Sequence, residues 1–226
     1  MKTSTCWLST LMMLLSASSM AVSQSHLTDS IPFFLINDDT IMYSNFKEII
    51  SEGDVREISI SNYSLRHSFD SIFQLSELRS LSFFNCDFDS VPEEIKKLKK
   101  LERLNFAYTK ITALPEEITR LKKLKSLSIS KTDCGNIYPC EFTVPEWIYK
   151  LPNLTELCIY DCAIERLPPR FHKSNIRTLI IHGGNFSSFP HELNHMSSLD
   201  YLVFSDSGVH CPIELRQKLK SCLCDE

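Results

Sequence analysis

The chain has 226 residues, of which 43% are hydrophobic and 23% are charged, and its formal net charge is −4 at pH 7. This composition excludes a disordered chain, which combines few apolar residues with a high net charge. The mildly acidic balance, without a block of basic residues, argues against binding to a phosphate backbone, so we expect no nucleic-acid partner.

The first 23 residues differ in character from the rest of the chain. Lys2 precedes a mostly apolar stretch from Trp7 to Leu15, and residues 21–23 then resemble the small-residue cleavage site of a signal peptide. This arrangement predicts a secretory signal peptide for residues 1–23, cleaved before Gln24; a membrane anchor is the alternative. Because the apolar run is too short to span a bilayer, we expect a secreted or extracytoplasmic protein without a membrane span after cleavage.

Residues 24–54 are predicted to form an N-terminal cap. From residue 31 onward, their pattern indicates a strand followed by an amphipathic helix.

From residue 55 onward the chain repeats itself. VPEEIKKLKKLERLNF begins at Val91, and LPEEITRLKKLKSLSI begins at Leu114, 23 residues later. Recurrence at this spacing, with an L-x-x-L-x-L pattern, is typical of leucine-rich repeats. The repeats are predicted to occupy residues 55–210 and to start at positions 55, 78, 101, 124, 154, 176 and 199.

On these residues the chain resembles the leucine-rich repeat family, and most of all its 23-residue form with L-P-x-x-I-x-x-L return segments, which occurs in bacterial repeat proteins and plant disease-resistance proteins. The resemblance implies an α/β fold, a leucine-rich repeat solenoid shaped as a curved horseshoe. About seven repeats would place a parallel β-sheet on the concave face and short helical or irregular segments on the convex face.

The column that holds Asn in the family departs from the family pattern. It reads Tyr63, Cys86, Thr109, Thr132, Cys162, Gly184 and Ser207. We expect Cys, Thr and Ser to hydrogen-bond the turning backbone there, although more weakly than Asn.

The repeat that starts at residue 124 is 30 residues long, and its surplus falls at residues 133–143. Cys134 and Cys140 bracket this insertion and are predicted to form a disulfide in an exported chain. Cys211 is predicted to pair with Cys222 or Cys224. This second bond would staple a C-terminal cap at residues 211–226, whose closing helix is indicated by Ile213, Leu215 and Leu219.

The stretch HELNH at residues 191–195 matches H-E-x-x-H, in which two histidines on one helix face hold zinc and the glutamate acts as general base. A zinc-dependent hydrolase is therefore an alternative function. It would use His191, Glu192 and His195, with His172 of the preceding repeat as a candidate third ligand.

The repeat register favours a simpler interpretation of this stretch. Leu193 and Met196 occupy core positions, so His191 and Glu192 take the places of the solvent-facing Glu116 and Glu117 on the convex side. A thiol–imidazole pair of Cys158 and His182, on a face where we expect Cys158 to be exposed, lacks an orienting acid. We therefore predict that the protein is not an enzyme and has no catalytic residue, cofactor or metal ion.

Strand side chains that do not enter the core face the concave side. Small polar residues dominate there, with a few large rings toward the middle, and rings among serines suit protein recognition. We predict a monomer whose concave face binds another protein; a structural spacer is the remaining alternative. The predicted contacts are Phe84, Tyr108, Lys131, Tyr160, Asp161 and His182. In a eukaryotic host, glycans would be expected at the sequons of Asn62, Asn153 and Asn185.

Overall fold

The structure is a computed structural model of the full chain, and it describes residues 33–36, 39–41, 55–61, 72–130 and 140–224. The chain divides into two units, Met1–Ile31 and Pro32–Glu226. The fold reported below is that of the second unit. The predicted signal peptide and most of the predicted N-terminal cap lie outside the described residues.

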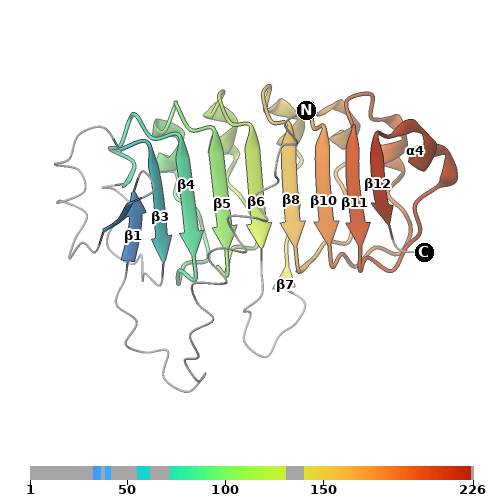
Figure 1. Ribbon diagram of the computed structural model, residues 1–226, viewed down its shortest axis with the longest axis horizontal. Coiled ribbons are helices and arrows are strands. Elements are labelled where there is room, and N and C mark those ends of the chain that lie inside the picture. The colour runs from blue at the N-terminus through green and yellow to red at the C-terminus, as the bar shows by residue number, and fades with distance from the viewer. Residues whose placement is uncertain (1–32, 37–38, 42–54, 62–71, 131–139, 225–226) are drawn as a thin grey trace, which may run out of the picture. The chain divides into compact units, whose positions relative to one another are not determined.

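Ten strands of the described chain form one sheet in the order β12-β11-β10-β8-β6-β5-β4-β3-β1-β2 (Figure 1). Eight of them run parallel, from β3 to β12, whereas β1 is antiparallel to both β2 and β3. Their bounds are β1 Phe33–Ile36, β2 Asp39–Ile41, β3 Glu57–Ser61, β4 Ser80–Phe84, β5 Arg103–Ala107, β6 Ser126–Ser130, β8 Glu156–Tyr160, β10 Thr178–His182, β11 Tyr201–Ser205 and β12 Ser221–Cys224.

The strands follow the repeat register. Each strand from β3 to β11 in this sheet begins two residues after one of the predicted repeat starts, as β5 at Arg103 follows the start at Leu101. Equivalent residues are paired, so that Leu104 lies between Leu81 and Leu127. Since alternate residues of a strand point to opposite faces, this pairing stacks all the inward leucines into one buried ladder.

A second ladder of larger side chains lies two residues further along each strand. Its members are all 1% exposed or less: Ile60, Phe83, Phe106, Ile129, Ile159, Ile181 and Phe204. The rings of Phe83 and Phe106 stack with centroids 5.6 Å apart and an angle of 6° between their planes. The two ladders make a continuous core beneath the sheet.

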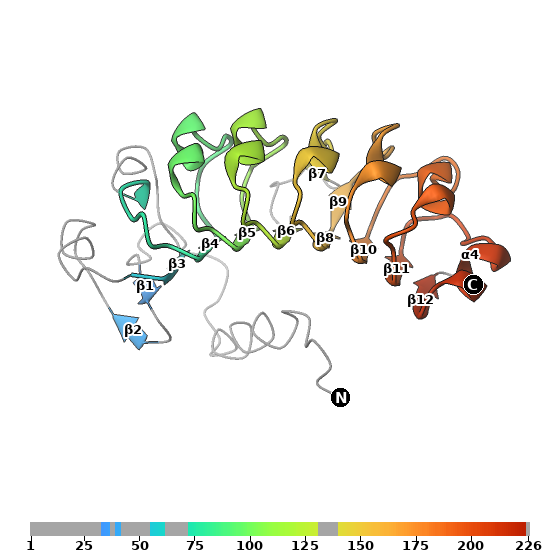
Figure 2. The ribbon, with the colours of Figure 1, turned by 90° about the horizontal axis from the view of Figure 1, so that it is seen from above.

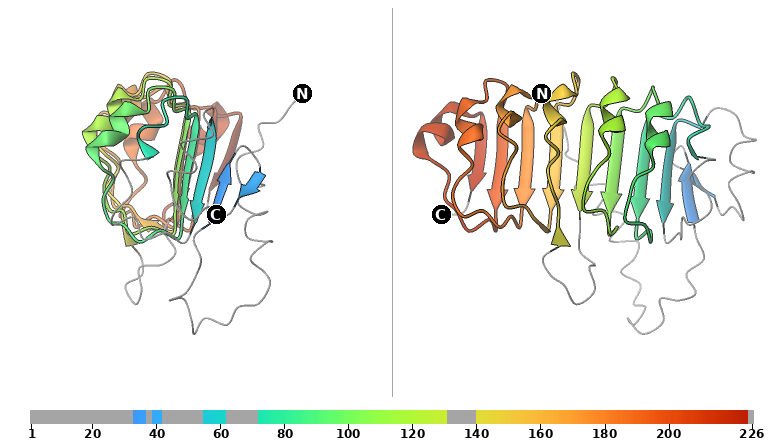
Figure 3. Two further views of the ribbon diagram at one scale, coloured as in Figure 1. Left: turned by 90° about the vertical axis from the view of Figure 1, so that its left-hand side faces the viewer. Right: turned by 180° about the vertical axis from the view of Figure 1, so that it is seen from behind.

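Short 3₁₀ helices carry the chain back on the opposite side of the core from the sheet (Figures 2 and 3). Proline precedes three of them, so each starts from extended backbone, and each buries one apolar residue, as η4 buries Ile118. Glutamates in the first turn and basic residues in the last suit the helix dipole. The bounds are η3 Glu93–Lys97, η4 Glu116–Arg120, η5 Ile148–Lys150, η6 Phe171–Lys173 and η7 His191–His195.

The C-terminal cap differs from the predicted closing helix. The helix α4 covers only Ile213–Lys218, and the next residues form the strand β12, which pairs in parallel with β11. Without β12, the edge of β11 would present unpaired backbone groups. Leu215 of α4 is buried, but Ile213 is 69% exposed, so only part of the predicted apolar face is used.

Three cysteines meet under this cap. Cys222 and Cys224 alternate with exposed residues of β12 and pack against the core beside buried Cys211. Burial raises the pKa of Cys211 to about 11 and also raises the pKa of Cys224. All three are thiols in the structure, and the predicted bond between Cys211 and Cys222 stays a prediction.

The insertion rejoins the described chain at β7, Cys140–Glu141, which pairs in parallel with β9, Cys162–Ala163. Cys134, the predicted partner of Cys140, lies outside the described residues.

The residues that stand where the family has Asn differ in whether they hydrogen-bond the backbone. The Cys86 thiol donates to the carbonyl oxygens of Ile60 and Phe84, each at 3.4 Å, and the Cys162 thiol donates to that of Tyr160 at 3.2 Å. The Thr109 hydroxyl, in contrast, is buried without a hydrogen-bond partner, so the expectation was wrong at that position.

None of the helices in the described part of the chain is long and apolar enough to cross a membrane.

The ladder architecture predicts a strong contrast between neighbouring residues of β6. Leu127→Ala should lower the free energy of unfolding by about 2–5 kcal/mol, because Leu127 is fully buried between Leu104 and Leu157. Ser128→Ala, on the other face of the same strand, should change it by less than about 0.5 kcal/mol. Urea unfolding followed by circular dichroism measures both values. Similar losses in the two variants would contradict the assigned register.

Candidate functional site

The sheet has one face on the core and one face turned away from the 3₁₀ helices, which we call the open face (Figure 2). Most small residues on the open face are sunk between their neighbours: Ser82 is 7% exposed, Ala107 0% and Ser130 6%. Large side chains, including Phe84, stand above them with intermediate exposure. The side chains that project from the open face are therefore mainly a few aromatic rings.

Two of the predicted contact residues form a pair at the carboxyl ends of β4 and β5. The rings of Phe84 and Tyr108 lie with their centroids 4.8 Å apart and are tilted by 58°. Phe84 is the last residue of β4, and Tyr108 directly follows β5. Both rings are half-buried, so each supports the other while leaving an edge for a partner.

A second group gathers at the same edge, around His182 at the end of β10. Its Nδ1 lies 3.2 Å from Oδ1 of Asp161, and its Nε2 lies 2.8 Å from Oδ2 of Asp206. The Tyr160 ring completes the group, 6.5 Å from the imidazole. A neutral imidazole donates to only one of the two carboxylates, whereas the protonated form donates to both.

The two groups lie on opposite sides of β6. Since neighbouring strands are about 4.8 Å apart, the two strand spacings from β5 to β8 put roughly 10 Å between the groups. The remaining predicted contact residue, Lys131, lies outside the described residues. The other five predicted residues are thus placed in two clusters along one edge of the open face.

The backbone explains which residue types line this edge. In five repeats the structure describes the residue that directly follows the strand, and it has a positive φ in each: Asn85 50°, Tyr108 55°, Asp161 53°, Gly183 80° and Asp206 49°. Asn, Asp and Gly tolerate this left-handed conformation, but for other residues it costs about 1–2 kcal/mol. Tyr108 is the exception, a bulky ring in a strained position beside Phe84.

Three residues of the open face escaped the sequence-based site. Asp206 joins the His182 group, and two apolar side chains extend the face toward the C-terminus: Tyr201 is 45% exposed and Leu223 is 64% exposed. Asp206 could have been found from the column it shares with Asp161. Leu223 could not, because it falls in the C-terminal cap, for which the sequence predicted a closing helix and no strand.

The Cys158–His182 pair does not form. Cys158 is level with Ile180, and His182 with Tyr160, so the two side chains sit at different heights of adjacent strands. Cys158 is only 4% exposed, which corrects the expectation of an exposed thiol, and its Sγ donates to Glu156 at 3.7 Å.

The H-E-x-x-H stretch forms η7, a 3₁₀ helix instead of an α-helix. At three residues per turn, positions four apart differ by about 120° around the axis, so His191 and His195 do not share a face. Glu192 was expected to face solvent, but it is 7% exposed, beside a His191 side chain that is 80% exposed. His172 does approach His195, with ring centroids 6.4 Å apart.

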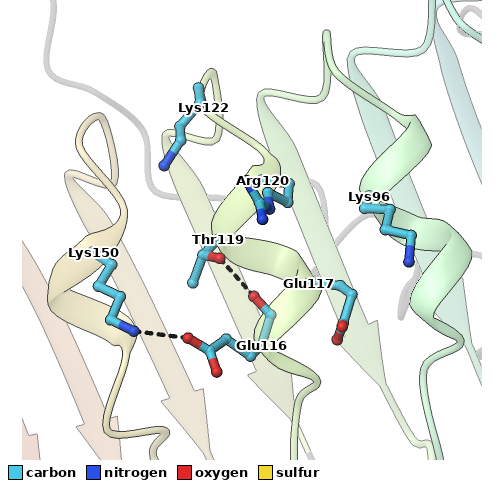
Figure 4. A pocket seen from close by; sticks show the side chains of 7 residues that line it. All are labelled: Lys96, Glu116, Glu117, Thr119, Arg120, Lys122 and Lys150. Carbon is cyan, nitrogen blue, oxygen red and sulfur yellow. Dashed lines mark hydrogen bonds and ion pairs between the residues drawn. The ribbon is translucent and has the colours of Figure 1, made fainter.

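A shallow hollow of about 430 Å³ lies on the side of the 3₁₀ helices, between η3, η4 and η5 (Figure 4). It is lined by charged side chains, but several are already paired. Lys150 donates to Glu116 at 2.7 Å, which lowers the pKa of the carboxyl group, and Lys96 binds Glu93. Paired and exposed charges of this kind form an ordinary solvated surface.

Parts of the chain are similar to known proteins in sequence and in fold. Residues 54–141 match a family model described as a leucine-rich repeat region. Among solved structures, a leucine-rich repeat protein of Leptospira interrogans is 19% identical with a TM-score of 0.52 and covers 74% of this chain and 48% of its own. The crystal structure of PEPR1–AtPEP1 is 18% identical with a TM-score of 0.52, and the match covers 77% of this chain and 25% of the chain in that structure.

Residues 54–141 are thus similar to a leucine-rich repeat region, and at these identities the likeness to the two solved structures concerns the fold alone. The chain spans less than half the length of either solved structure. A search of curated protein sequences finds no match.

The strain at Tyr108 is measurable once its ring contact has been removed. In a Phe84→Ser background, Tyr108→Asn should raise the free energy of unfolding by about 1 kcal/mol, because Asn tolerates the positive φ that Tyr does not. In the native background the gain should be smaller, since the ring pair is lost as well. The four chains are compared by urea unfolding. If Tyr108→Asn lowers the stability of the Phe84→Ser chain, the strain is refuted.

Proposed function

We propose that this protein is an exported recognition module that binds another protein through the open face of its repeat sheet. The observation that carries the proposal is Tyr108. A left-handed backbone position that holds Asn, Asp or Gly in the four other repeats where the structure describes it here holds a half-exposed ring, at a cost in stability. The contact with Phe84 offsets part of that cost, and contact with a partner would explain the part of the ring that stays exposed.

The chemistry of the face supports a protein partner. Rings such as Phe84 and Tyr160 offer a large contact area at a low cost in side-chain entropy, and small buried residues between them leave room for the partner's side chains. Eight parallel strands at about 4.8 Å give a strip roughly 35 Å long, close to what one side of a standard interface requires.

The two clusters would select different features of the partner. The Phe84–Tyr108 pair suits an apolar side chain. Asp161 and Asp206, which flank His182 at 3.2 Å and 2.8 Å, suit a basic group beside it. We expect Tyr201 and Leu223 to extend the apolar contact toward β12.

The comparisons point the same way at the level of the class. Leucine-rich repeat domains are typically interaction modules without catalysis, and one structure with this fold joins PEPR1 with AtPEP1. We therefore propose a non-enzymatic role. Secretion after cleavage before Gln24, a monomeric state and a concave curvature of the open face belong to the same proposal.

The test is a capture experiment with the full chain on extracellular fluid of its source. A triple variant, Phe84→Ser, Tyr108→Ser and Tyr160→Ser, should lose a partner that the native chain retains, because it removes the rings of both clusters. Bound proteins are identified by mass spectrometry, and affinity is then measured with the purified partner. We expect a loss of roughly a hundredfold or more.

The matched control changes three side chains on the opposite side of the core, Lys97→Ser, Lys123→Ser and Tyr149→Ser. These residues lie on or beside η3, η4 and η5 and should leave capture unchanged. Melting curves establish that both triple variants fold. Loss of the partner in the control, or retention in the ring variant, would move the site away from the open face.

The insertion is proposed to share in the contact, since it joins β6 next to both clusters. Replacing residues 133–139 by a glycine–serine linker keeps β7 and its pairing with β9, so the repeats should stay intact. We expect the affinity for the partner to fall at least tenfold. An unchanged affinity in a chain with an unchanged melting temperature would exclude the insertion from the interface.

A further inference from the structure

The C-terminal cap contains a side-chain cluster that the recognition function does not use. The thiols of Cys211, Cys222 and Cys224 converge, with all three Sγ atoms within 4.8 Å of one another. Sγ of Cys222 lies 3.6 Å from that of Cys211 and 3.3 Å from that of Cys224. Among the residues that the structure describes, no other trio of histidine, cysteine or acidic side chains comes together in this way.

From this geometry we propose that Cys211, Cys222 and Cys224 bind a single thiophilic metal ion, for which Zn²⁺ is the natural probe. Zinc holds sulfur at about 2.3 Å in a tetrahedron, which places two ligand sulfurs about 3.8 Å apart. The observed separations are close to this value, so only small side-chain rotations are needed. The fourth position of the tetrahedron is left to a ligand from solvent.

The strand geometry fixes two of the ligands. Cys222 and Cys224 are two residues apart on β12, so their side chains point to the same face, and this face is the one that packs on the core. Their register partners on β11, Leu202 and Phe204, are core residues. The site therefore closes the end of the hydrophobic ladder.

The third ligand comes from a different segment. Cys211 precedes α4 and is 5% exposed. An ion held by Cys211 and β12 would join the two ends of the segment that contains α4, which otherwise buries only Leu215. One disulfide would use only two of the three converging thiols, whereas a soft metal ion, which prefers thiolate ligands, could use all three.

The experiment uses the full chain, reduced and desalted without oxygen. Titration with Co²⁺ should give a thiolate-to-cobalt charge-transfer band that saturates at one ion per chain, and Zn²⁺ should displace it. Because loss of a residue that merely orients a metal ligand weakens binding about 10–100-fold, Cys211→Ser, Cys222→Ser and Cys224→Ser should each weaken it more than tenfold.

Two control variants separate this site from the other candidates. Cys158→Ser removes a buried thiol elsewhere, and His191→Ala with His195→Ala removes the H-E-x-x-H imidazoles; both should bind Co²⁺ as the native chain does. If a cysteine variant does not fold, the native chain still decides. Zn²⁺ added to the native chain should raise the melting temperature of that chain and protect Cys211, Cys222 and Cys224, but not the other cysteines, from alkylation.

Three results would overturn the proposal: no stoichiometric uptake of Co²⁺ by the reduced chain, uptake that survives in Cys222→Ser, or uptake that is lost in the histidine variant. If the reduced chain takes up no metal and the air-exposed chain has lost two hydrogens, peptide mapping would assign the disulfide predicted from the sequence.

Discussion

The structure depends on one constraint: no repeat can bury its own apolar side chains. Leu104 and Phe106 of β5 are covered only because Leu81 and Phe83 lie on one side and Leu127 and Ile129 on the other. Each unit therefore stabilises its neighbours, and equivalent residues must stay level along the sheet. A shift of one residue would turn every inward side chain outward, so the register is strongly specified.

The same constraint makes the two ends of the ladder special. At β3 the sheet continues into the antiparallel strands β1 and β2, and at β11 it ends with α4 and β12. These segments do not follow the repeat pattern, and the outermost strands, β2 and β12, each have a neighbour on one side only. Sulfur replaces leucine at this C-terminal end, where Cys222 and Cys224 lie beside Leu202 and Phe204. A metal or a covalent bond can supply there the stabilisation that a missing repeat would otherwise give.

The period of the repeats was enough to predict the strands and the buried ladders, because stacking admits one register. It was not enough where local geometry competes with the pattern. H-E-x-x-H predicts a zinc site only on an α-helix, and the single turn after Pro190 is too short to become one. Residues 221–224 alternate between exposed and half-buried, a strand pattern, but the nearby helical spacing obscured it.

The proposed binding face follows from the backbone as much as from the side chains. After β4, β5, β8, β10 and β11 the chain leaves the sheet through a left-handed residue, which is Asn, Asp or Gly in every case but Tyr108. Two of these positions, Asp161 and Asp206, lie on either side of His182, the last residue of β10. Aspartate at these positions both tolerates the left-handed backbone and adds a carboxylate to the surface. Tyr108 does not suit the turn, and its ring lies on the surface against Phe84. Its strain, more than its exposure, is therefore the reason for proposing that a partner binds at this edge of the open face.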